Sequence, residues 1–438
     1  MAKIIVAAPP VPGEFAPMLQ LARALDARGH RITVLSGSAF REPVQNAGLA
    51  FAPLTGDADY DIGDVVAGRE KAGVTPGTSD EINFDWIHAF VDPMPQEHRD
   101  LQQLLDQDPD QYLISNVLFL GALPVRRGAP GRRPLRWTAV SVVGLAISSE
   151  DSTFFGPAPV GPGEDAKAAN RVGNAQFRAA TAPTRDRLNE LLREMGADET
   201  SDGFVDCIYT APDATAVLSV PGFEFHRDDL PDNIHLVGAL PAEPVGEWEP
   251  PSWWSELDGS RPVVVVTQET LANHDLTQLV EPALAGLAGL DVTVVAALGA
   301  DPASLTIPVP ANAHVASYLP FDALLPKANV LITDGGPGWT HRALSAGLPV
   351  IMAGSTEDKP ANGARVAYHH LGINLGTATP TAQAVAQATT ALLADVEIRD
   401  NVARLAKVYA EHDPAVEIEA RTLDFALWAR CAGRSAPA

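Results

Sequence analysis

The segment PPVPGEFAPM, residues 9–18, places an acid, Glu14, shortly after an apolar run and at the start of a helical pattern. A carboxylate at a helix N-terminus is stabilised by the helix dipole by about 0.3 kcal/mol, so the position needs no function. A carboxyl group in an apolar pocket can instead have its pKa raised toward neutrality and serve as general acid or base. We therefore weigh Glu14 as a catalytic group against a favourable helix charge.

Two further segments carry polar residues and glycines directly after apolar runs: TQET, residues 267–270, and DGGPGWT, residues 334–340. In open parallel sheets, ligands bind at the carboxyl ends of strands, where loops enter helix N-termini. Glycines there let the backbone approach a ligand and let amide groups point at an anion. The same glycines could serve a tight turn alone, so the pattern by itself is a weak indication of an anion site.

These segments belong to two series of alternating strand and helix patterns. The first predicts strands at KIIVAAP, RITVLSG, QYLISNVLFLG and LRWTAVSVV, with a helix at APMLQLARALDARGH. The second predicts strands at PVVVVTQET, DVTVVAAL, HVASYL, VLITDGG and VIMAGS, helices at LTQLVEPALAGLAGL and WTHRALSAG, and a helical tail over about 382–429. Strands joined through helices form parallel sheets. The sequence therefore predicts an α/β fold of two Rossmann-like domains facing each other across a cleft.

A change of composition marks the boundary between the two series. The stretch PAEPVGEWEPPSWWSELDGSRP is dense in Pro, Glu and Trp, which is typical of an interdomain linker with a short helix. The predicted division is an N-terminal domain over 1–240, a linker over 241–262, a C-terminal domain over 263–414 and a final helix over 415–438.

Composition argues against several classes of function. The formal net charge of −24 disfavours nucleic acids and anionic membranes, because both need a basic face. Cys207 and Cys431 supply neither a disulfide framework nor a metal-site spacing, so we predict no metal. The N-terminal apolar run is too short for a signal peptide or a membrane span. We expect a cytoplasmic protein, a monomer or homodimer, that acts on a small molecule.

Three stretches together resemble the nucleotide-sugar-dependent glycosyltransferases of the macrolide-modifying and UDP-glucosyltransferase type. They are PPVPGEFAPMLQLARALDARGHRITVL, VVVVTQET and HVASYLPFDALLPKANVLITDGGPGWTHRALSAGLPVIMAGSTEDKPANGARV. The resemblance covers nearly the whole chain, and its C-terminal stretch is highly specific. It implies the GT-B fold, with the acceptor on the N-terminal domain, a UDP- or TDP-sugar on the C-terminal domain, no further cofactor, and a terminal helix that crosses back.

The resemblance also locates a catalytic base. The family's base is a histidine in the first turn, oriented by an aspartate at the end of a later strand, and the matching positions here are Glu14 and Asn116. A Glu beside an Asp would be repelled, whereas a Glu beside an Asn can accept a hydrogen bond from the amide. We therefore expect Glu14 to face the cleft, close to Asn116, with a raised pKa.

Donor-binding positions follow from the same resemblance. They are Thr267, Glu269, Thr270, Leu319, Asp334, Gly335, Gly336, Gly338, Trp339, Asp358 and Lys359. Asp358 matches the acid that usually holds sugar hydroxyls, and Lys359 stands where glutamine is common.

Several of these positions depart from the family pattern in the same direction. Glu269 replaces a glycine, Asp334 replaces the histidine of HGGxGT, and Trp339 occupies the small-residue position. Each acid near a diphosphate costs on the order of 1 to 4 kcal/mol at intermediate dielectric, and Trp339 would take up the volume of phosphate oxygens. Lys359 or Arg342 would have to offset this cost if a nucleotide sugar is used.

The aromatic-rich segment NFDWIHAFVDPMP supplies candidates for the acceptor pocket. We predict Trp86, His88 and Phe90 of this segment, together with Phe119 of QYLISNVLFLG, as lining residues, with ordinary core packing as the alternative.

Three functions are compatible with these residues. The first is an inverting glycosyltransferase that moves a sugar from a UDP- or TDP-sugar to a hydroxyl of a hydrophobic natural product, with Glu14 as base. The second keeps the fold but not the nucleotide sugar, and uses Glu14 and Asn116 for a cyclisation, dehydration or isomerisation. The third is a non-catalytic binding partner. The nearly complete resemblance favours the first function, although a fold alone does not fix function.

Overall fold

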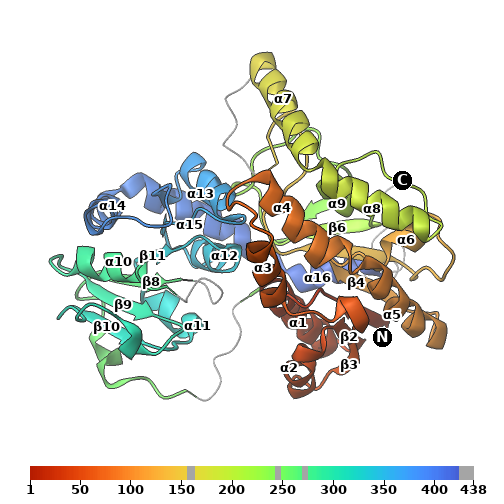
Figure 1. Ribbon diagram of the computed structural model, residues 1–438. Helices are drawn as coiled ribbons and strands as arrows, with labels where there is room; N and C mark the ends of the chain where they lie inside the picture. The colour runs from red at the N-terminus through yellow and green to blue at the C-terminus, as the bar shows by residue number, and fades with distance from the viewer. Residues whose placement is uncertain (155–162, 242–247, 269–274, 424–438) are drawn as a thin grey trace.

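The computed structural model describes residues 1–154, 163–241, 248–268 and 275–423. In these ranges the chain forms two α/β domains that lie side by side, each built on one parallel sheet (Figure 1). The predicted fold class is confirmed. In the described ranges, all strands of one sheet come from residues 3–236 and all strands of the other from residues 263–374. The predicted linker and domain boundaries remain predictions.

The first domain contains a seven-stranded sheet in the order β3-β2-β1-β4-β5-β6-β7. Its strands are β1 (Lys3–Ala7), β2 (Arg31–Ser36), β3 (Ala50–Pro53), β4 (Tyr112–Asn116), β5 (Trp137–Ser141), β6 (Ala214–Val217) and β7 (Ile234–Leu236). The central strands are buried apolar runs because helices cover both faces of a parallel sheet. In the register of β1 with β4, Ala7 pairs with Ser115, so the loops after these two strands begin at one edge.

The second domain contains a six-stranded sheet in the order β10-β9-β8-β11-β12-β13. Its strands are β8 (Val263–Thr267), β9 (Thr293–Ala297), β10 (Ala313–Ala316), β11 (Val330–Thr333), β12 (Val350–Met352) and β13 (Gly372–Asn374). Strand β8 lies beside β11, and Thr267 pairs with Thr333. The segments after Thr267 and Thr333 therefore begin next to each other at one edge of the sheet, as the strand-end argument requires.

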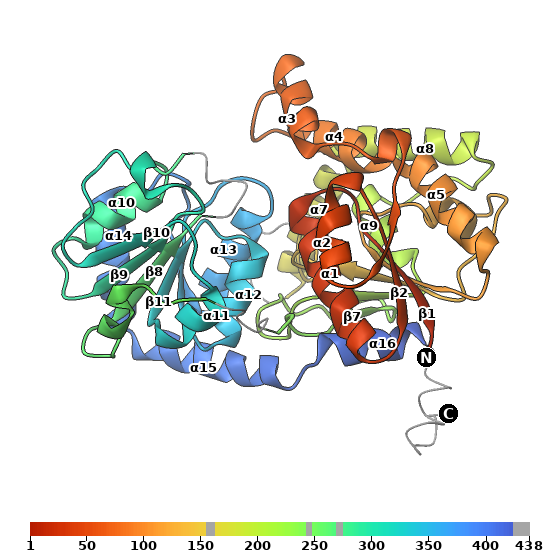
Figure 2. The same cartoon turned by 90° about the horizontal axis from the view of Figure 1, so that it is seen from below.

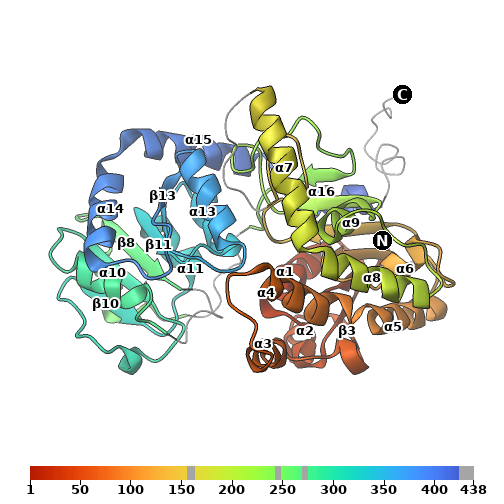
Figure 3. The same cartoon turned by 45° about the horizontal axis from the view of Figure 1, so that its top comes forward.

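Helices cover the faces of both sheets. Those of the first domain are α1 (Pro12–Ala27), α2 (Arg41–Asn46), α3 (Ile62–Lys71), α4 (Ser79–Trp86), α5 (Met94–Gln107), α6 (Leu123–Arg126), α7 (Glu164–Ala180), α8 (Ala182–Glu194) and α9 (Phe204–Thr210). The later helices are α10 (Val280–Leu287), α11 (Phe321–Leu324), α12 (Pro337–Ser345), α13 (Lys359–Tyr368), α14 (Ala382–Ala394), α15 (Val396–Ala410) and α16 (Pro414–Thr422). Helices α12 and α13 lie on the side of the second domain that faces the first (Figure 2), and Figure 3 shows α13 in the same place.

The predicted helical tail is divided into three helices by two aspartates. Asp395 accepts a hydrogen bond from the Ile398 N–H, and Asp413 accepts one from the Val416 N–H, so each begins a new helix as its N-cap. Helix α15 runs along the second domain toward the first, and α16 lies beneath the first sheet (Figure 2). There the Thr422 hydroxyl lies 3.0 Å from that of Thr138. The tail beyond residue 423 is outside the described residues.

The aromatic segment predicted as a pocket-lining loop or helix is helical. It comprises the end of α4, one π-helical turn over Ile87–Val91, and the start of α5. No helix in the described ranges is long and apolar enough to cross a membrane.

Candidate active site at the domain interface

Glu14 and Asn116 meet at the carboxyl edge of the first sheet. Asn116 is the last residue of β4, and Glu14 lies in the first turn of α1, which follows the adjacent strand β1. The Asn116 Nδ2 donates a hydrogen bond of 2.6 Å to Glu14 Oε2. The Leu118 N–H donates to Asn116 Oδ1 at 2.8 Å, so the amide oxygen is engaged and the NH₂ group must face Glu14. The predicted contact between the two side chains is present.

The environment of Glu14 suits a general base near neutral pH. Burial raises its pKa from 4.5 to about 7, the Asn116 hydrogen bond lowers it, and the acids Asp358 and Glu357 raise it further. The helix dipole at the start of α1 would favour the charged form, so burial outweighs the dipole here. Since Asp358 and Glu357 precede α13 in the second domain, Glu14 faces the domain interface.

The start of α13 carries a second carboxyl group with a raised pKa. Asp358 is the N-cap residue of this helix, and burial raises its pKa to about 6, although the Lys359 ammonium opposes the change. The Asn362 Nδ2 lies 3.1 Å from Asp358 Oδ2 and also 3.0 Å from the carbonyl oxygen of Gly335. Asn362 therefore links Asp358, which the family resemblance predicts to bind sugar hydroxyls, with Gly335 of the glycine loop.

Lys359 is the basic group beside the acidic glycine loop. Its side chain is only 6% exposed, and its Nζ lies 3.9 Å from Asp334 Oδ2 and 2.5 Å from Glu357 Oε2. One cation thus lies between two carboxylates, which reduces the repulsion that Asp334 would exert on an anionic ligand. The close packing requires a glycine at position 354, since a Cβ there would lie 1.9 Å from the Asp334 carbonyl oxygen.

The first turn of α12 retains N–H groups that can meet an anion. Gly336 is its N-cap and Pro337, which has no N–H, is its first residue, so Gly338 and Trp339 carry the first free amides. Gly338 is exposed. Gly335 has a φ of +103°, and a Cβ there would lie 2.7 Å from the Met352 Cε, so both backbone conformation and space call for glycine.

Trp339 and Arg342 pack within their own domain. The Trp339 ring lies 4.1 Å from that of Phe321 in α11, and the Arg342 guanidinium lies 5.6 Å from the Trp339 ring centre. Arg342 also forms an ion pair of 3.2 Å with Asp322. We expected Trp339 to fill the volume of phosphate oxygens, and its packing on Phe321 was not predicted. Of the two cations expected to compensate the acids, Lys359 lies beside Asp334, whereas Arg342 pairs with Asp322.

The remaining residues predicted to bind the sugar donor are either buried or outside the described ranges. The Thr267 hydroxyl lies 3.2 Å from the Ala297 carbonyl oxygen, so it bonds to the neighbouring strand. Leu319 is 2% exposed and belongs to the core of the second domain. Glu269 and Thr270 lie outside the described residues.

The acceptor candidates divide between core and surface. Phe119 is completely buried and Phe90 nearly so, which favours a packing role for both. Trp86 is half-buried against Phe204, with ring centres 5.3 Å apart. His88 is exposed and pairs with an aspartate on the same helical segment. A lining role for Trp86 and His88 stays a prediction.

Three residues near the site were missed from the sequence. Asn362 could have been found from its helical spacing to Asp358 in STEDKPAN. Glu357, just before α13, has a φ of 55°, which is unusual for a non-glycine residue. Tyr60 gave no signal, yet Glu14 is one of the groups that raise its pKa, after burial and Glu97. Its hydroxyl donates to the Ala89 carbonyl oxygen at 2.5 Å.

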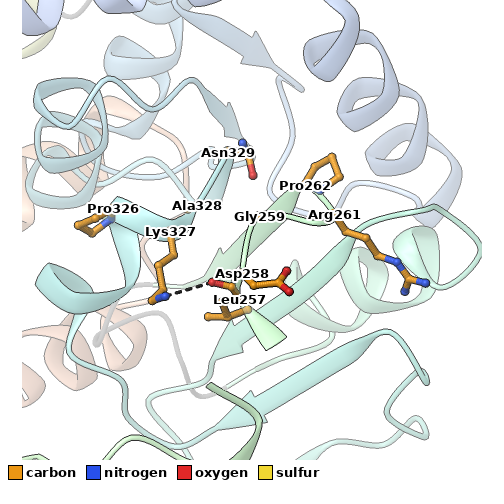
Figure 4. A pocket seen from close by; sticks show the side chains of 9 residues that line it. All are labelled: Leu257, Asp258, Gly259, Arg261, Pro262, Pro326, Lys327, Ala328 and Asn329. Carbon is orange, nitrogen blue, oxygen red and sulfur yellow. Dashed lines mark hydrogen bonds between the residues drawn. The ribbon is translucent and has the colours of Figure 1, made fainter. Parts of the chain in front are cut away.

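A separate surface cavity lies at the opposite edge of the second sheet. It is lined by residues that precede β8 and β11, including Arg261 and Asn329, and the Lys327 Nζ donates to the Leu257 carbonyl oxygen at 3.1 Å beside it (Figure 4). Its place at the amino ends of the strands separates it from Glu14 and Asp358. Among the residues that the structure describes, no group of three or more His, Cys, Asp or Glu side chains is placed to hold a metal ion.

Two Rossmann-like domains, with a base candidate on one and a glycine loop on the other, form the architecture of the GT-B class. Residues 281–423 match the family described as erythromycin biosynthesis protein CIII-like, C-terminal domain. The chain is 34% identical over 428 residues to 4'-demethylrebeccamycin synthase from Lentzea aerocolonigenes, covering 95% of this chain and 97% of that protein. It is 31% identical over 428 residues to UDP-glycosyltransferase 2 from Phaeomoniella chlamydospora, covering 94% and 92%.

The chain belongs to the nucleotide-sugar-dependent glycosyltransferases of the macrolide-modifying and UDP-glucosyltransferase family, as the resemblance predicted. Its fold is also similar to the crystal structure of CalG4, the calicheamicin glycosyltransferase, with a TM-score of 0.72, 20% identity and complete coverage of both chains.

Proposed function

We propose that the protein transfers a sugar, with inversion, from a UDP- or TDP-sugar to a hydroxyl group of a hydrophobic natural product, with Glu14 as the base. The observation that carries this proposal is the hydrogen bond from Asn116 to Glu14 at a half-buried position facing Asp358 of the second domain. The names of two similar proteins, UDP-glycosyltransferase 2 and 4'-demethylrebeccamycin synthase, support the donor and acceptor classes.

The proposed reaction is a single displacement. The acceptor oxygen attacks the anomeric carbon from the face opposite the diphosphate, the new C–O bond forms, and the bond to the phosphate oxygen breaks. The diphosphate leaves with the electron pair, and the hydroxyl proton passes to a Glu14 carboxylate oxygen. Asn116 occupies Oε2, which leaves Oε1 available for the acceptor. A pKa of about 7 keeps a useful fraction of Glu14 ionised at neutral pH.

The second domain would hold the donor. Asp358, the N-cap of α13, would accept hydrogen bonds from sugar hydroxyls, and the Gly338 amide would donate to a phosphate oxygen at the start of α12. Lys359 would partly neutralise Asp334 beside the glycine loop.

Glu14→Gln tests the proposed base. The Gln side chain keeps the shape but cannot accept the proton, so turnover with a UDP- or TDP-sugar and an acceptor hydroxyl should fall by a factor of about 100 to 10,000. Circular dichroism and thermal unfolding serve as the control for folding. Unchanged turnover in a folded Glu14→Gln protein would remove Glu14 from the mechanism.

A second candidate function is supported by the contacts of Lys359 with acidic side chains. Because this cation already contacts Glu357 and lies near Asp334, the site offers little net positive charge to a diphosphate. The alternative is acid–base chemistry by Glu14 and Asn116 on a natural product without a nucleotide sugar, such as a cyclisation, dehydration or isomerisation. Turnover that needs no added donor, together with no binding of UDP or TDP at millimolar concentration in calorimetry, would favour this candidate.

A further inference from the structure

A buried arginine of the second domain, Arg365, is held by groups of the first domain. Its side chain is 1% exposed, and its Nε donates a hydrogen bond of 2.8 Å to Glu224 Oε2. Its Nη2 donates to the Leu145 carbonyl oxygen at 2.9 Å, and its guanidinium lies 5.1 Å from the Phe225 ring centre. The loop after β5 and the segment after β6 therefore enclose one guanidinium group from α13.

Two features of the first domain accommodate the Arg365 side chain. The Leu145 N–H donates to Glu224 Oε1 at 3.0 Å, so the carboxylate is fixed before it meets Arg365. A Cβ at Gly144 would lie 3.2 Å from the Arg365 Cζ, so the glycine lets the loop approach the guanidinium group closely. Although burial opposes it, the Arg365 and Arg227 guanidinium groups hold the pKa of Glu224 below its usual value. An ion pair that is this well enclosed fixes orientation more than it adds stability.

The same helix carries Asp358 at its other end. Arg365 lies seven residues after Asp358, so the rise of α13 separates the two positions by about 10 Å. A helix of this length is rigid, and the Arg365 Nη1 also donates to the Ala361 carbonyl oxygen within it. A shift of Arg365 relative to Glu224 and Leu145 would therefore move Asp358 relative to Glu14.

We propose that Arg365 is a positioning residue: its contacts with Glu224 and Leu145 set α13 against the first domain so that Asp358 faces Glu14 across the interface. The inference builds on the proposed role of Glu14 as base. It assigns to Arg365 no contact with substrate.

The charged and titratable groups facing Glu14 give this proposal a specific readout. They are Asp358 and Glu357 ahead of α13, Tyr60 after β3, and Tyr209 on α9. Only the two acids belong to the second domain, and both raise the pKa of Glu14. If the domains separate, these acids recede and water enters, and both changes lower the pKa of Glu14.

The experiment compares Arg365→Gln, Arg365→Lys and the double variant Glu224→Gln/Arg365→Gln with the unmodified protein. The ¹³C NMR titration of Glu14, identified by difference from Glu14→Gln, should move to lower pH in all three. The value of kcat/KM should fall by about 10- to 100-fold, as expected when reacting groups are misplaced by about 1 Å. The control Arg126→Gln removes a 3.1 Å ion pair with Asp213 inside the first domain and should change neither quantity.

An unmoved Glu14 titration in a folded Arg365 variant would overturn the positioning role, whatever happens to activity. The double variant leaves the buried Arg227 without its carboxylate partner, so Arg365→Lys, which keeps the charge beside Glu224, provides the folded protein if the Gln variants do not fold. The titration is read without turnover, so it tests the position of Glu14 even if Glu14→Gln retains full activity and the proposed function fails.

Discussion

Replacing Asn116 by Asp should suppress Glu14 as a base near neutral pH, and the geometry gives the size of the effect. The Leu118 N–H holds the Oδ1 position, so the second carboxylate oxygen would take the place of Nδ2, which lies 2.6 Å from Glu14 Oε2. For a charge separation of about 4 Å and an effective dielectric constant of about 20, the repulsion is about 4 kcal/mol. The lost hydrogen bond adds about 1.5 kcal/mol.

Because Glu14 is only half-buried, solvent reduces this sum, and we take about 3 kcal/mol as the cost of ionising Glu14 beside an aspartate. Each 1.36 kcal/mol corresponds to about a tenfold change in an ionisation equilibrium, so the ionised fraction at neutral pH should fall by about 100-fold. The measurement is kcat/KM as a function of pH. Activity should be low at neutral pH and should return as pH rises, because Glu14 is a base only above its pKa.

Asn116→Ala is the matched control, since it removes the hydrogen-bond donor without adding a charge. Its loss should be about tenfold, smaller than that of Asn116→Asp. The reasoning is refuted if the acid limb of the pH profile of Asn116→Asp coincides with that of the unmodified protein, or if the alanine variant is the more impaired of the two.

The remaining predictions concern stability and the donor. The pKa of Glu14 is raised on folding from 4.5 to about 7, so its contribution to stability is fully present below the unfolded value and is lost as pH rises through the folded one. Glu14→Gln should therefore stabilise the protein by about 1 to 3 kcal/mol at pH 8 and by nothing at pH 4, and thermal unfolding at both pH values would expose a wrong sign. Lys359→Ala removes the cation between Asp334 and Glu357, so calorimetry should show about a tenfold weaker affinity for a nucleoside diphosphate, and an unchanged Kd would show that this cation does not compensate the acids.

The strand-end rule accounts for what the sequence could predict of the site. Glu14 and Asn116 follow adjacent parallel strands, so their convergence at one edge depends only on the order of the strands. The amide orientation also follows from chemistry, because a carboxylate selects the NH₂ side of an asparagine. The sequence did not decide whether Lys359 or Arg342 contacts the acidic loop, since Arg342 carries the same charge on a nearby helix.

The directions of side chains within a domain could not be predicted in the same way. Trp339 packs on Phe321 because of the rotation of α12 relative to α11, and no periodicity in the sequence gives that rotation. Phe119 was predicted to line a pocket but is completely buried, since an aromatic side chain just after a strand serves equally as core or lining. Glu357 approaches Glu14 only through the assembly of the two domains, and Tyr60 approaches it through the tertiary packing of the first domain. Neither contact is encoded locally in the sequence.

A glutamate base has a different cost from a histidine base, and the difference is one additional negative charge that faces the donor. A neutral histidine becomes a cation when it takes the acceptor proton, whereas a glutamate becomes neutral, so the charge of the base changes by one positive unit in both cases. The additional negative charge repels the donor before the transfer, which weakens donor binding. The diphosphate gains negative charge as it leaves with the electron pair, so the repulsion grows in the transition state and lowers kcat as well as raising KM. Under the proposed function, a lysine at position 359, where the family commonly has glutamine, opposes this repulsion, because it adds a positive charge beside the phosphate-binding loop.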